Sequence, residues 1–212
     1  MAGGARTEEG PSKGPRQRSR VRYERRRDEV VAAAAHVFAQ RGFHATTIDD
    51  LIEATGLQRG GLYHYMSSKD DLLGEIHRRL MEPLLAEVER IDVESHDPTT
   101  AIRLIGHALA ENLRDYNDEM IVFLHEWRRI RDHPEWEEIR RGRRDLEHVI
   151  ERTLRRGVIQ GAFEIPDMRL AVLALLGMFN HAHQWFRPDG RVTADELADA
   201  FIDIFLNGIQ SD

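Results

Sequence analysis

The chain has 212 residues, of which 41% are hydrophobic and 32% are charged, and it contains no cysteine. This length and hydrophobic content suffice for a packed core in one large domain or two smaller ones. The lack of cysteine excludes disulfides and thiolate-bound metal sites. The net charge of −7 is unevenly spread: residues 1–70 carry 12 Lys/Arg against 9 Asp/Glu, whereas the remainder carries 18 against 28. A basic N-terminal part on an acidic body predicts local contact with nucleic acid.

The sequence gives no signal for secretion or membrane insertion. Its N-terminus lacks the apolar stretch of a signal peptide. The most apolar run without a charge, Leu170–Phe179, covers only ten residues and is too short to span a bilayer. These features, with the absence of cysteine, predict a cytoplasmic protein with no membrane partner.

Residues 1–20 are rich in Gly, Pro, Ser and Arg and show no apolar period, which predicts a disordered arm. Between Lys13 and Arg27 there are eight positive residues and one negative residue, Glu24. A solubilising tail would explain this composition. Next to a DNA-binding domain, the same charges would neutralise phosphates or enter a minor groove.

After a predicted helix over about residues 22–40, residues 46–71 predict two short helices joined by a tight turn, then the start of a longer helix. The first short helix has an apolar side formed by Ile48, Leu51 and Ile52. Thr46 or Thr47 can cap its start, and Gly56 can end it. Corners between helices occur in many helical proteins. However, the polar, glycine-bearing start of the second helix suits a helix-turn-helix that reads DNA.

The side chains of this region divide into two groups by chemistry. Gln58 and Arg59 begin the second helix and carry an amide and a guanidinium fork, which are suited to base edges. Neighbouring polar groups are suited to phosphate contacts that set the register, although His64 would also be ordinary as a surface residue. The predicted DNA-binding residues are Arg25, Arg26, Thr47, Gln58, Arg59, Gly60, Tyr63, His64 and Lys69.

From residue 69 onward the apolar pattern is helical throughout. A long helix is predicted over residues 69–93, with Pro83 expected to kink or split it. The predicted fold is all-α with about nine helices. Its parts are a basic arm (1–20), a three-helix DNA-binding domain (21–68) and a helical effector-binding and dimerisation domain (69–212).

The last two predicted helices, at about 166–185 and 193–209, favour a homodimer. The first is apolar on nearly all sides, which predicts burial on more than one of them. Two copies of the pair would form a four-helix bundle around a two-fold axis. Such a dimer suits half-sites spaced about 34–36 Å apart on DNA. The predicted interface residues are Leu173, Ala174, Gly177, Leu197, Phe201 and Phe205.

No pattern in the sequence indicates catalysis or metal binding. The closest histidine pair, His181 and His183, has a spacing that points to different sides of a helix. There is no His-Glu-x-x-His pattern and no glycine-rich phosphate loop. The sequence therefore predicts that the protein is not an enzyme and has no metal or cofactor. A helical enzyme or carrier with an incidental helix-turn-helix remains an alternative.

A ligand pocket between the later helices is also predicted, although an ordinary filled core would have the same composition. Apolar and aromatic groups at helical spacing could line a cavity. Arginines at 128–156 alternate with acids, as on a solvated helix face, and leave a surplus suited to phosphate or carboxylate. The predicted ligand-binding residues are Leu109, Leu113, Tyr116, Phe123, Trp127, Arg144, Phe179, His181 and Trp185.

Two segments, FAQRGFHATTI (38–48) and ATGLQRGGLYHYMSSKDDL (54–72), resemble the DNA-binding domain of TetR-family regulators. The resemblance covers about 45 residues and is specific as a set. It implies DNA contacts by Thr47, Tyr63 and Lys69.

The second half is similar to TetR-type repressors of fatty-acid and steroid catabolism, which bind coenzyme A thioesters. The likeness rests on Glu126-Trp127-Arg128, Arg144-Asp145, Gly157-x-x-x-Gly161-x-Phe163 and the segment from Asn180 to Gly190. His181 departs from it, since many such relatives have Trp there. The resemblance implies a dimeric repressor that binds a palindromic operator in double-stranded DNA and is released by a small apolar or acyl-CoA effector. The alternative is a DNA-binding regulator without a small-molecule effector, either partner-controlled or architectural.

Overall fold

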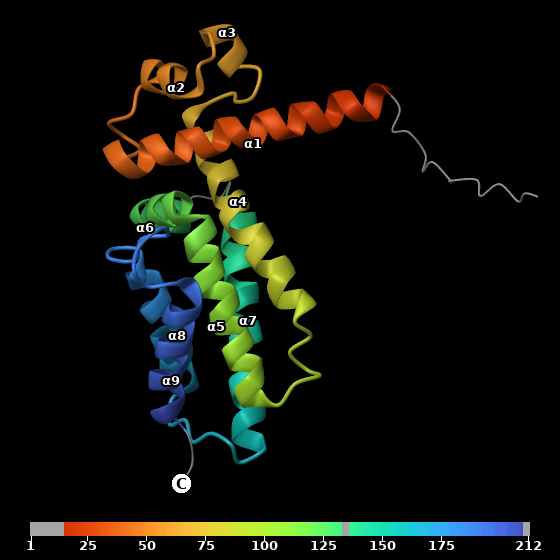
Figure 1. Cartoon of the computed structure of the whole chain (residues 1–212), viewed down its shortest axis with the longest axis vertical. Helices are drawn as coiled ribbons and strands as arrows, with labels where there is room; N and C mark the ends of the chain where they lie inside the picture. The colour runs from red at the N-terminus through yellow and green to blue at the C-terminus, as the bar shows by residue number, and fades with distance from the viewer. Residues whose placement is uncertain (1–14, 133–135, 210–212) are drawn as a thin grey trace, which may run out of the picture.

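The computed structural model describes residues 15–132 and 136–209, and within them the chain forms nine helices (Figure 1). This confirms the all-α fold predicted from the sequence. The helices are α1 (Pro15–Arg41), α2 (Ile48–Thr55), α3 (Arg59–Leu62), α4 (Lys69–Arg90), α5 (Pro98–Asp115), α6 (Asn117–Asp132), α7 (Glu137–Ile159), α8 (Met168–Ala182) and α9 (Ala194–Asn207).

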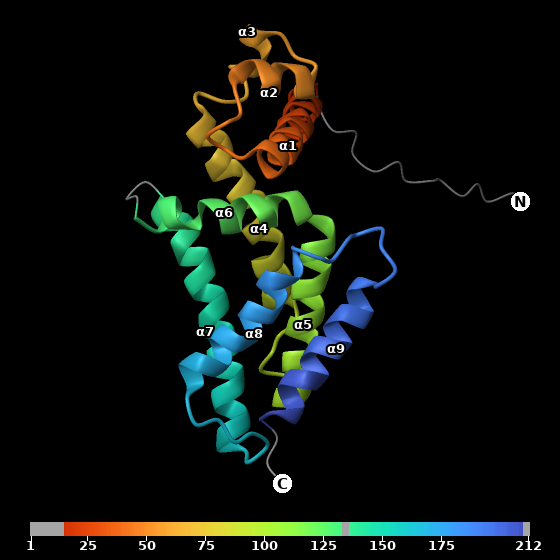
Figure 2. The same ribbon diagram turned by 90° about the vertical axis from the view of Figure 1, so that its left-hand side faces the viewer.

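The molecule is elongated, with α1, α2 and α3 at one end and α5, α7, α8 and α9 forming the body at the other (Figure 1). The long helix α4 begins in the small end and continues into the body, while α6 crosses between the two (Figures 1 and 2). In both views α3 lies at the tip farthest from the body. The element with the predicted reading function is therefore the one most accessible to a duplex.

Helix α1 is longer than the sequence pattern predicted. It begins at Pro15, so residues 15–20 of the predicted disordered arm are helical, and residues 1–14 lie outside the described part of the chain. Proline is well tolerated in the first helical turn because its missing N–H would have no partner there. The residues that follow include arginine and glutamine, which favour helix.

The predicted helix caps on either side of the tight turn are confirmed. Thr47 caps α2 in a capping box with Asp50, and Ser68 caps α4 in the same way with Asp71. Gly56 ends α2 with φ +65°, a left-handed conformation in which a side chain would be strained. These local hydrogen bonds fix the corner that carries α3.

Pro83 does not split α4, contrary to one of the two outcomes predicted for it. The helix runs without interruption from Lys69 to Arg90. Because proline removes one helical hydrogen bond, this continuity has to be supported by packing. Helix α4 contacts α1, α5, α6 and α7, and its buried residues Met81 and Leu84 lie on either side of the proline.

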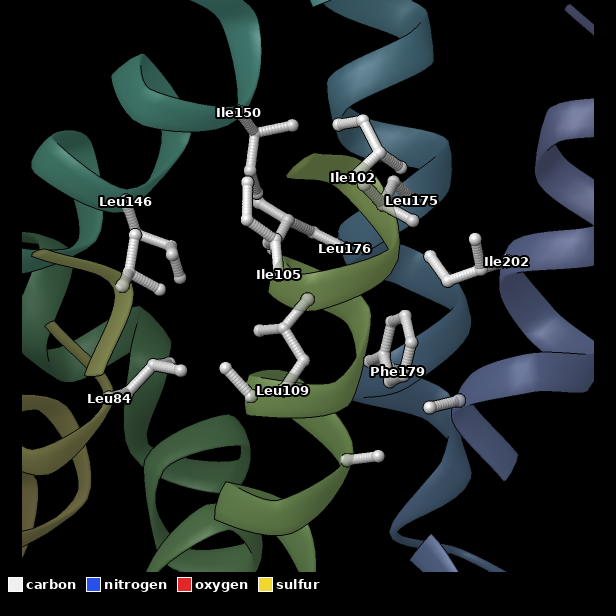
Figure 3. Close-up of a cluster of buried hydrophobic side chains, with 14 of the residues drawn as sticks. Leu84, Ile102, Ile105, Leu109, Leu146, Ile150, Leu175, Leu176, Phe179 and Ile202 are labelled. Atoms are coloured by element: carbon white, nitrogen blue, oxygen red, sulfur yellow. The ribbon is translucent and has the colours of Figure 1, made fainter. Parts of the chain in front are cut away.

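Two apolar clusters hold the molecule together. The larger lies in the body, where side chains from α4, α5, α7, α8 and α9 meet (Figure 3). The smaller joins α1, α2, α3 and the start of α4 to Val122 and Ile130 of α6. Helix α5 approaches α9 closely at Gly106, where an added Cβ would lie 2.4 Å from Ile202. The shared helices α4 and α6 therefore join the DNA-binding end to the body.

Candidate nucleic-acid interface and effector pocket

The tip of the molecule presents a short, exposed helix. Leu62 of α3 is fully buried and anchors the helix in the smaller apolar cluster. Gln58, Arg59 and Gly60 are exposed, and the Gln58 side chain makes no capping bond. No atom lies within 4 Å of the position that a Cβ on Gly60 would occupy. The start of α3 is therefore open to close approach by a partner.

Arg59 is held by an acidic neighbour on α2. Its guanidinium donates to the Asp49 carboxylate at 2.7 Å, and both side chains are more than half exposed. Tyr63 follows directly after α3 and is 47% exposed. An ion pair this exposed is weak, because water screens it. Arg59 can therefore exchange Asp49 for a base edge at little cost.

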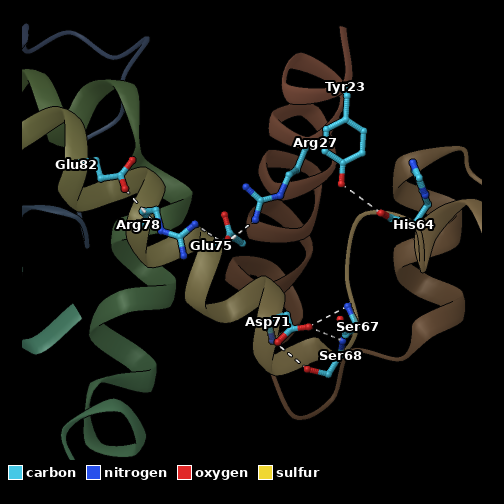
Figure 4. Close-up of polar contacts among 9 residues, drawn as sticks. All are labelled: Tyr23, Arg27, His64, Ser67, Ser68, Asp71, Glu75, Arg78 and Glu82. Carbon is cyan, nitrogen blue, oxygen red and sulfur yellow. Dashed lines mark hydrogen bonds and ion pairs between the residues drawn. The ribbon is translucent and has the colours of Figure 1, made fainter. Parts of the chain in front are cut away.

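The loop after α3 is fixed to α1 by Tyr23, a residue that the sequence analysis missed. Its hydroxyl donates to the backbone oxygen of His64 at 3.3 Å (Figure 4). Its ring stacks on Tyr65 at 5.3 Å and meets the edge of His64 at 5.4 Å. Tyr23 lies before the apolar stripe of its helix, so periodicity gave no indication of this contact.

Two predicted phosphate ligands also support the local backbone. The Lys69 ammonium donates to the carbonyls of Phe43 and Thr46 at 2.7 and 2.6 Å. Arg26 donates to the carbonyl of Thr55 at the end of α2, at 3.0 Å. Thr47, Arg25 and His64 are exposed on the same domain. The DNA contacts of these residues remain predictions.

Charged pairs connect the DNA-binding end to the body through α4. Arg27 of α1 pairs with Glu75 at 2.6 Å, and Arg78 also pairs with Glu75 at 2.6 Å (Figure 4). One turn further, Arg79 pairs with Glu119 of α6 at 2.8 Å. Burial raises the pKa of Glu119, an effect that Arg79 opposes. Both domains therefore contact the same turns of α4.

A hollow of about 560 Å³ lies between α6, α7 and α8 and is rich in arginine. The guanidinium of Arg143 lies 4.3 Å from the centre of the Trp127 ring, and Arg143 also pairs with Glu147 at 2.9 Å. We call this hollow the arginine pocket. Its lining residues are Trp127, Arg131, Arg140, Arg143, Arg144, Glu147, His148, Glu151, Arg169, Val172 and Leu173.

The predicted ligand residues do not meet in one cavity. Trp127 and Arg144 line the arginine pocket. His181 and Trp185 are exposed at the other end of α8. The remaining residues are buried or half-buried in the body, where Leu109 and Phe179 pack against their neighbours (Figure 3): Leu109, Leu113, Tyr116, Phe123 and Phe179. The sequence analysis did not single out Arg140, Arg143 or Arg169 as ligand residues, because a helical pattern does not show which arginines surround one hollow.

A second cavity of about 290 Å³ lies between α4 and α7, and His77 is among its lining residues. His77 is fully buried, and its Nδ1 bonds to the Leu73 carbonyl. A carbonyl can only accept, so Nδ1 carries the proton and Nε2 is an acceptor without a partner among the described residues. Burial lowers the pKa of His77 to about 4, which keeps the ring neutral at pH 7. None of the predicted ligand residues lines this cavity.

The predicted dimer residues fall on different surfaces of a single chain. Leu173, Ala174 and Gly177 of α8 are exposed. Leu197 and Phe205 of α9 are instead buried within the chain, where α9 packs along α5. Phe201 is half-buried and contacts Phe179. The apolar stripe predicted for the dimer on α9 is therefore used inside the chain, and Ile204, which lies beside it, is 66% exposed.

The described residues hold neither a cluster of metal-binding side chains nor a membrane-spanning helix. No group of three or more His, Asp or Glu side chains is placed to hold a metal ion there. None of the helices within residues 15–132 and 136–209 is long and apolar enough to cross a membrane.

The chain, which folds into a helix-turn-helix end joined by one long helix to a helical body, matches two family models. Residues 30–76 match the model of bacterial regulatory proteins of the tetR family. Residues 95–209 match the model of the tetracyclin repressor-like C-terminal domain. The chain therefore belongs to the TetR family of transcriptional regulators, whose members bind DNA through a helix-turn-helix. It is not an enzyme.

Individual relatives agree with this assignment. The transcriptional repressor KstR2 of Mycobacterium tuberculosis is 26% identical over 87% of this chain and 92% of its own length. The solved structure of this ketosteroid transcriptional regulator is similar to the present fold, with a TM-score of 0.82 over 88% of this chain and 96% of that one. The TetR-family regulator PfmR from Thermus thermophilus is 34% identical with a TM-score of 0.77, covering 87% and 100%. AibR, solved with isovaleryl coenzyme A and operator DNA, shares the fold at 24% identity, with a TM-score of 0.74 over 84% and 97%.

Proposed function

We propose that the protein is a dimeric repressor that binds a palindromic operator and is released from it by an acyl-CoA effector. The observation that carries the effector class is the arginine pocket, where five arginines and one tryptophan border apolar side chains of α8. Arginine is the side chain best suited to phosphate, and the carrier part of coenzyme A is a polyanion. The apolar residues Val172 and Leu173 would contact the acyl part.

The dimer is proposed from the apolar surface of the last two helices. Leu170, Leu173 and Ile204 are 64%, 43% and 66% exposed. Helices α8 and α9 lie on one side of the molecule, where a second copy can pack (Figure 2). Large apolar side chains exposed on neighbouring helices are typical of an interface. A two-fold axis through this face would place two copies of α3 on one side of a duplex, as a palindrome requires.

The two sites communicate through α4 in this proposal. The DNA-bound state and the ligand-bound state differ in the spacing of the two copies of α3. An effector releases the operator only if it binds the second state more tightly. Two relatives support the choice of effector and response. KstR2 is named a repressor and a ketosteroid regulator, and AibR shows that this fold can hold an acyl-CoA and DNA.

The test is a calorimetric titration of the full chain with a long-chain acyl-CoA, with free coenzyme A as the reference ligand. We expect about one thioester bound per chain, free coenzyme A to bind much more weakly, and Arg143→Ala to weaken both. Arg155→Ala is the matched control, because Arg155 pairs with Glu151 on α7 and does not line the arginine pocket. If titration with the thioester and titration with free coenzyme A both give no heat of binding, the acyl-CoA proposal is refuted.

A regulator controlled without a small-molecule effector is the second candidate. The close packing of Leu109, Leu113 and Phe179 in the body favours it, because a filled core leaves no apolar tunnel there. The two candidate functions are distinguished with one duplex. It carries a palindrome that the protein itself enriches from random DNA. Release of this duplex by a thioester supports the proposed repressor, and tight binding that no thioester weakens supports the second candidate.

A further inference from the structure

The first three turns of α1 extend beyond the packed part of the molecule. Every residue from 17 to 25 is exposed, and the buried side of the helix begins at Val30. The extension points away from the body (Figure 1). A helical segment of this length is marginal in water without tertiary packing. Its helical form therefore suits a partner that the isolated chain does not supply.

Four arginines form a line along one side of this extension. Arg18, Arg22, Arg25 and Arg26 have the spacing i, i+4, i+7, i+8, which places them on one face. We call this face the α1 arginine stripe. No acidic residue lies between 15 and 23. At the inner end of the stripe, Glu29 pairs with Arg26 at 2.7 Å and with Arg25 at 3.6 Å.

The stripe runs into a basic hollow of about 450 Å³ beside the loop that follows α3. Arg22, Arg25 and Arg26 line this hollow together with Tyr23 and Tyr65. Tyr23 stacks on Tyr65 and donates to the backbone oxygen of His64, so the hollow is joined to the loop that follows α3. A concave surface with three guanidinium groups and one carboxylate is suited to a phosphate backbone.

The charge of the helix end also favours an anionic partner. Positive side chains near a helix N-terminus are repelled by the helix dipole, and α1 has no acidic residue in its first turn. Phosphate groups bound along the stripe would relieve this repulsion.

The position of the stripe defines which part of the DNA it can reach. Figure 1 shows the N-terminal end of α1 on the side of the molecule opposite α8 and α9, and rising toward the level of α3. In a dimer formed through α8 and α9, this end points away from the two-fold axis. It therefore reaches the duplex outside the half-site that α3 reads.

We propose that the α1 arginine stripe binds the sugar-phosphate backbone of operator DNA beyond the outer edge of each half-site. From Arg18 to Arg26 the helix rises about 12 Å, a length that matches about three phosphates along one strand. The contact adds affinity and salt dependence without base preference. The inference rests on the proposed dimeric arrangement on a palindrome.

The test uses the palindrome that the full chain enriches from random DNA, in two duplexes. One duplex ends at the palindrome, and the other extends it by about one helical turn of arbitrary sequence on each side. We expect the wild type to bind the longer duplex at least about tenfold more tightly at low salt. Arg18→Ala/Arg22→Ala should remove this gain and reduce the slope of log affinity against log salt by about 3 to 4 per dimer.

Two control variants distinguish the effect of where a positive charge lies on the helix from the effect of how many positive charges there are. Arg20 lies on the opposite side of the same helix and pairs with Glu24 at 2.8 Å, so Arg20→Ala should keep the flank-dependent gain that Arg22→Ala lowers. Arg22→Lys should retain most of the gain, because a phosphate contact needs mainly the charge. Circular dichroism of each variant tests whether the helix content is kept.

The experiment distinguishes failure of the stripe proposal from failure of the proposed function. If no palindrome is enriched, the dimeric operator proposal fails. If a palindrome is enriched and both duplexes bind the wild type equally, or if Arg20→Ala and Arg22→Ala lose the gain alike, the stripe proposal is overturned while the operator proposal stands.

Discussion

Lys69 supports the backbone of the DNA-binding domain, and a phosphate contact is predicted for the same side chain. Its ammonium holds the carbonyls of Phe43 and Thr46, which belong to the loop between α1 and α2. The same group lies 4.7 Å from the centre of the Phe43 ring. Two donated bonds leave one N–H for a phosphate. The residue therefore connects the start of α4 to the loop that places α2.

A pair of substitutions separates these roles. Lys69→Ala should lower the free energy of unfolding by about 2 kcal/mol, because it removes hydrogen bonds from a charged donor. Tyr63→Ala, at a side chain that is 47% exposed, should change stability by less than about 0.5 kcal/mol. Both should weaken DNA binding across sequences. Urea unfolding measures stability, and fluorescence anisotropy measures DNA binding. Equal stability of the two variants would contradict the structural role of the Lys69 hydrogen bonds.

Arg59 is the residue from which base preference is expected. Its guanidinium is exposed at the tip and pairs with Asp49. Arg59→Ala should cost about 1–3 kcal/mol on the preferred duplex and relax the preference at one base position. Selection from random DNA with both proteins tests this prediction. Unchanged base preference would mean that another residue of α3 reads that position.

His77 predicts a pH dependence of stability. The folded pKa of about 4 lies below the ordinary 6.5, so below pH 6.5 the unfolded chain binds a proton that the folded chain excludes. Stability due to the neutral ring is fully present above pH 6.5 and is lost as the pH falls toward 4. Between pH 7 and 5 this loss is about 2 kcal/mol. His77→Leu should abolish this part, which urea unfolding of both proteins at the two pH values measures.

At the scale of helices, capping signals and apolar periods predicted most of the fold. Thr47, Gly56 and Ser68 act as predicted because caps depend on neighbours only a few residues away. The length of α1 was missed because its first turns have no apolar stripe, and the pattern recorded only the packed part. The continuity of α4 through Pro83 was missed because packing by other helices decides it.

The candidate sites were less predictable than the fold, for a related reason. The short reading helix was located because its residues are contiguous in the sequence. The arginine pocket combines residues from α6, α7 and α8, and only the folded chain brings Arg140, Arg143 and Arg169 together. Likewise, the spacing of Leu197 and Phe205 in the sequence is equally compatible with packing against a second copy of the chain and with packing against α5. The structure shows that α5 occupies it.

Replacing glycine by alanine is expected to have opposite effects on stability at two positions, because one of them lies where α5 and α9 approach closely. Gly106→Ala would place a Cβ 2.4 Å from Ile202 and should destabilise the body by about 1–3 kcal/mol. Gly74→Ala, in α4, meets no atom within 4 Å and should stabilise by about 0.5–1 kcal/mol through helix propensity. Thermal unfolding compares the two variants. A shift in the same direction for both would contradict the packing described here.

At the scale of the whole molecule, the exposed face of α8 predicts assembly. Leu173→Glu should give a monomeric mass in light scattering at micromolar concentration and lower affinity for a palindromic duplex, with the helix content unchanged. Val21→Glu, at a similarly exposed apolar residue on α1, should keep the dimeric mass. A wild-type protein that is already monomeric would contradict the proposed interface.

The unbroken course of α4 makes it a lever with a weak point at Pro83. About 14 residues separate Lys69 from that proline, which corresponds to an arm of about 21 Å. Prolines are common pivots for bending because the helix lacks one hydrogen bond there. A bend of about 10° at this pivot would carry the tip by about 4 Å, more than one base-pair rise in each half of a dimer. In the proposed dimer, a small change of volume beside the pivot would thus be amplified into a mismatch with two successive grooves.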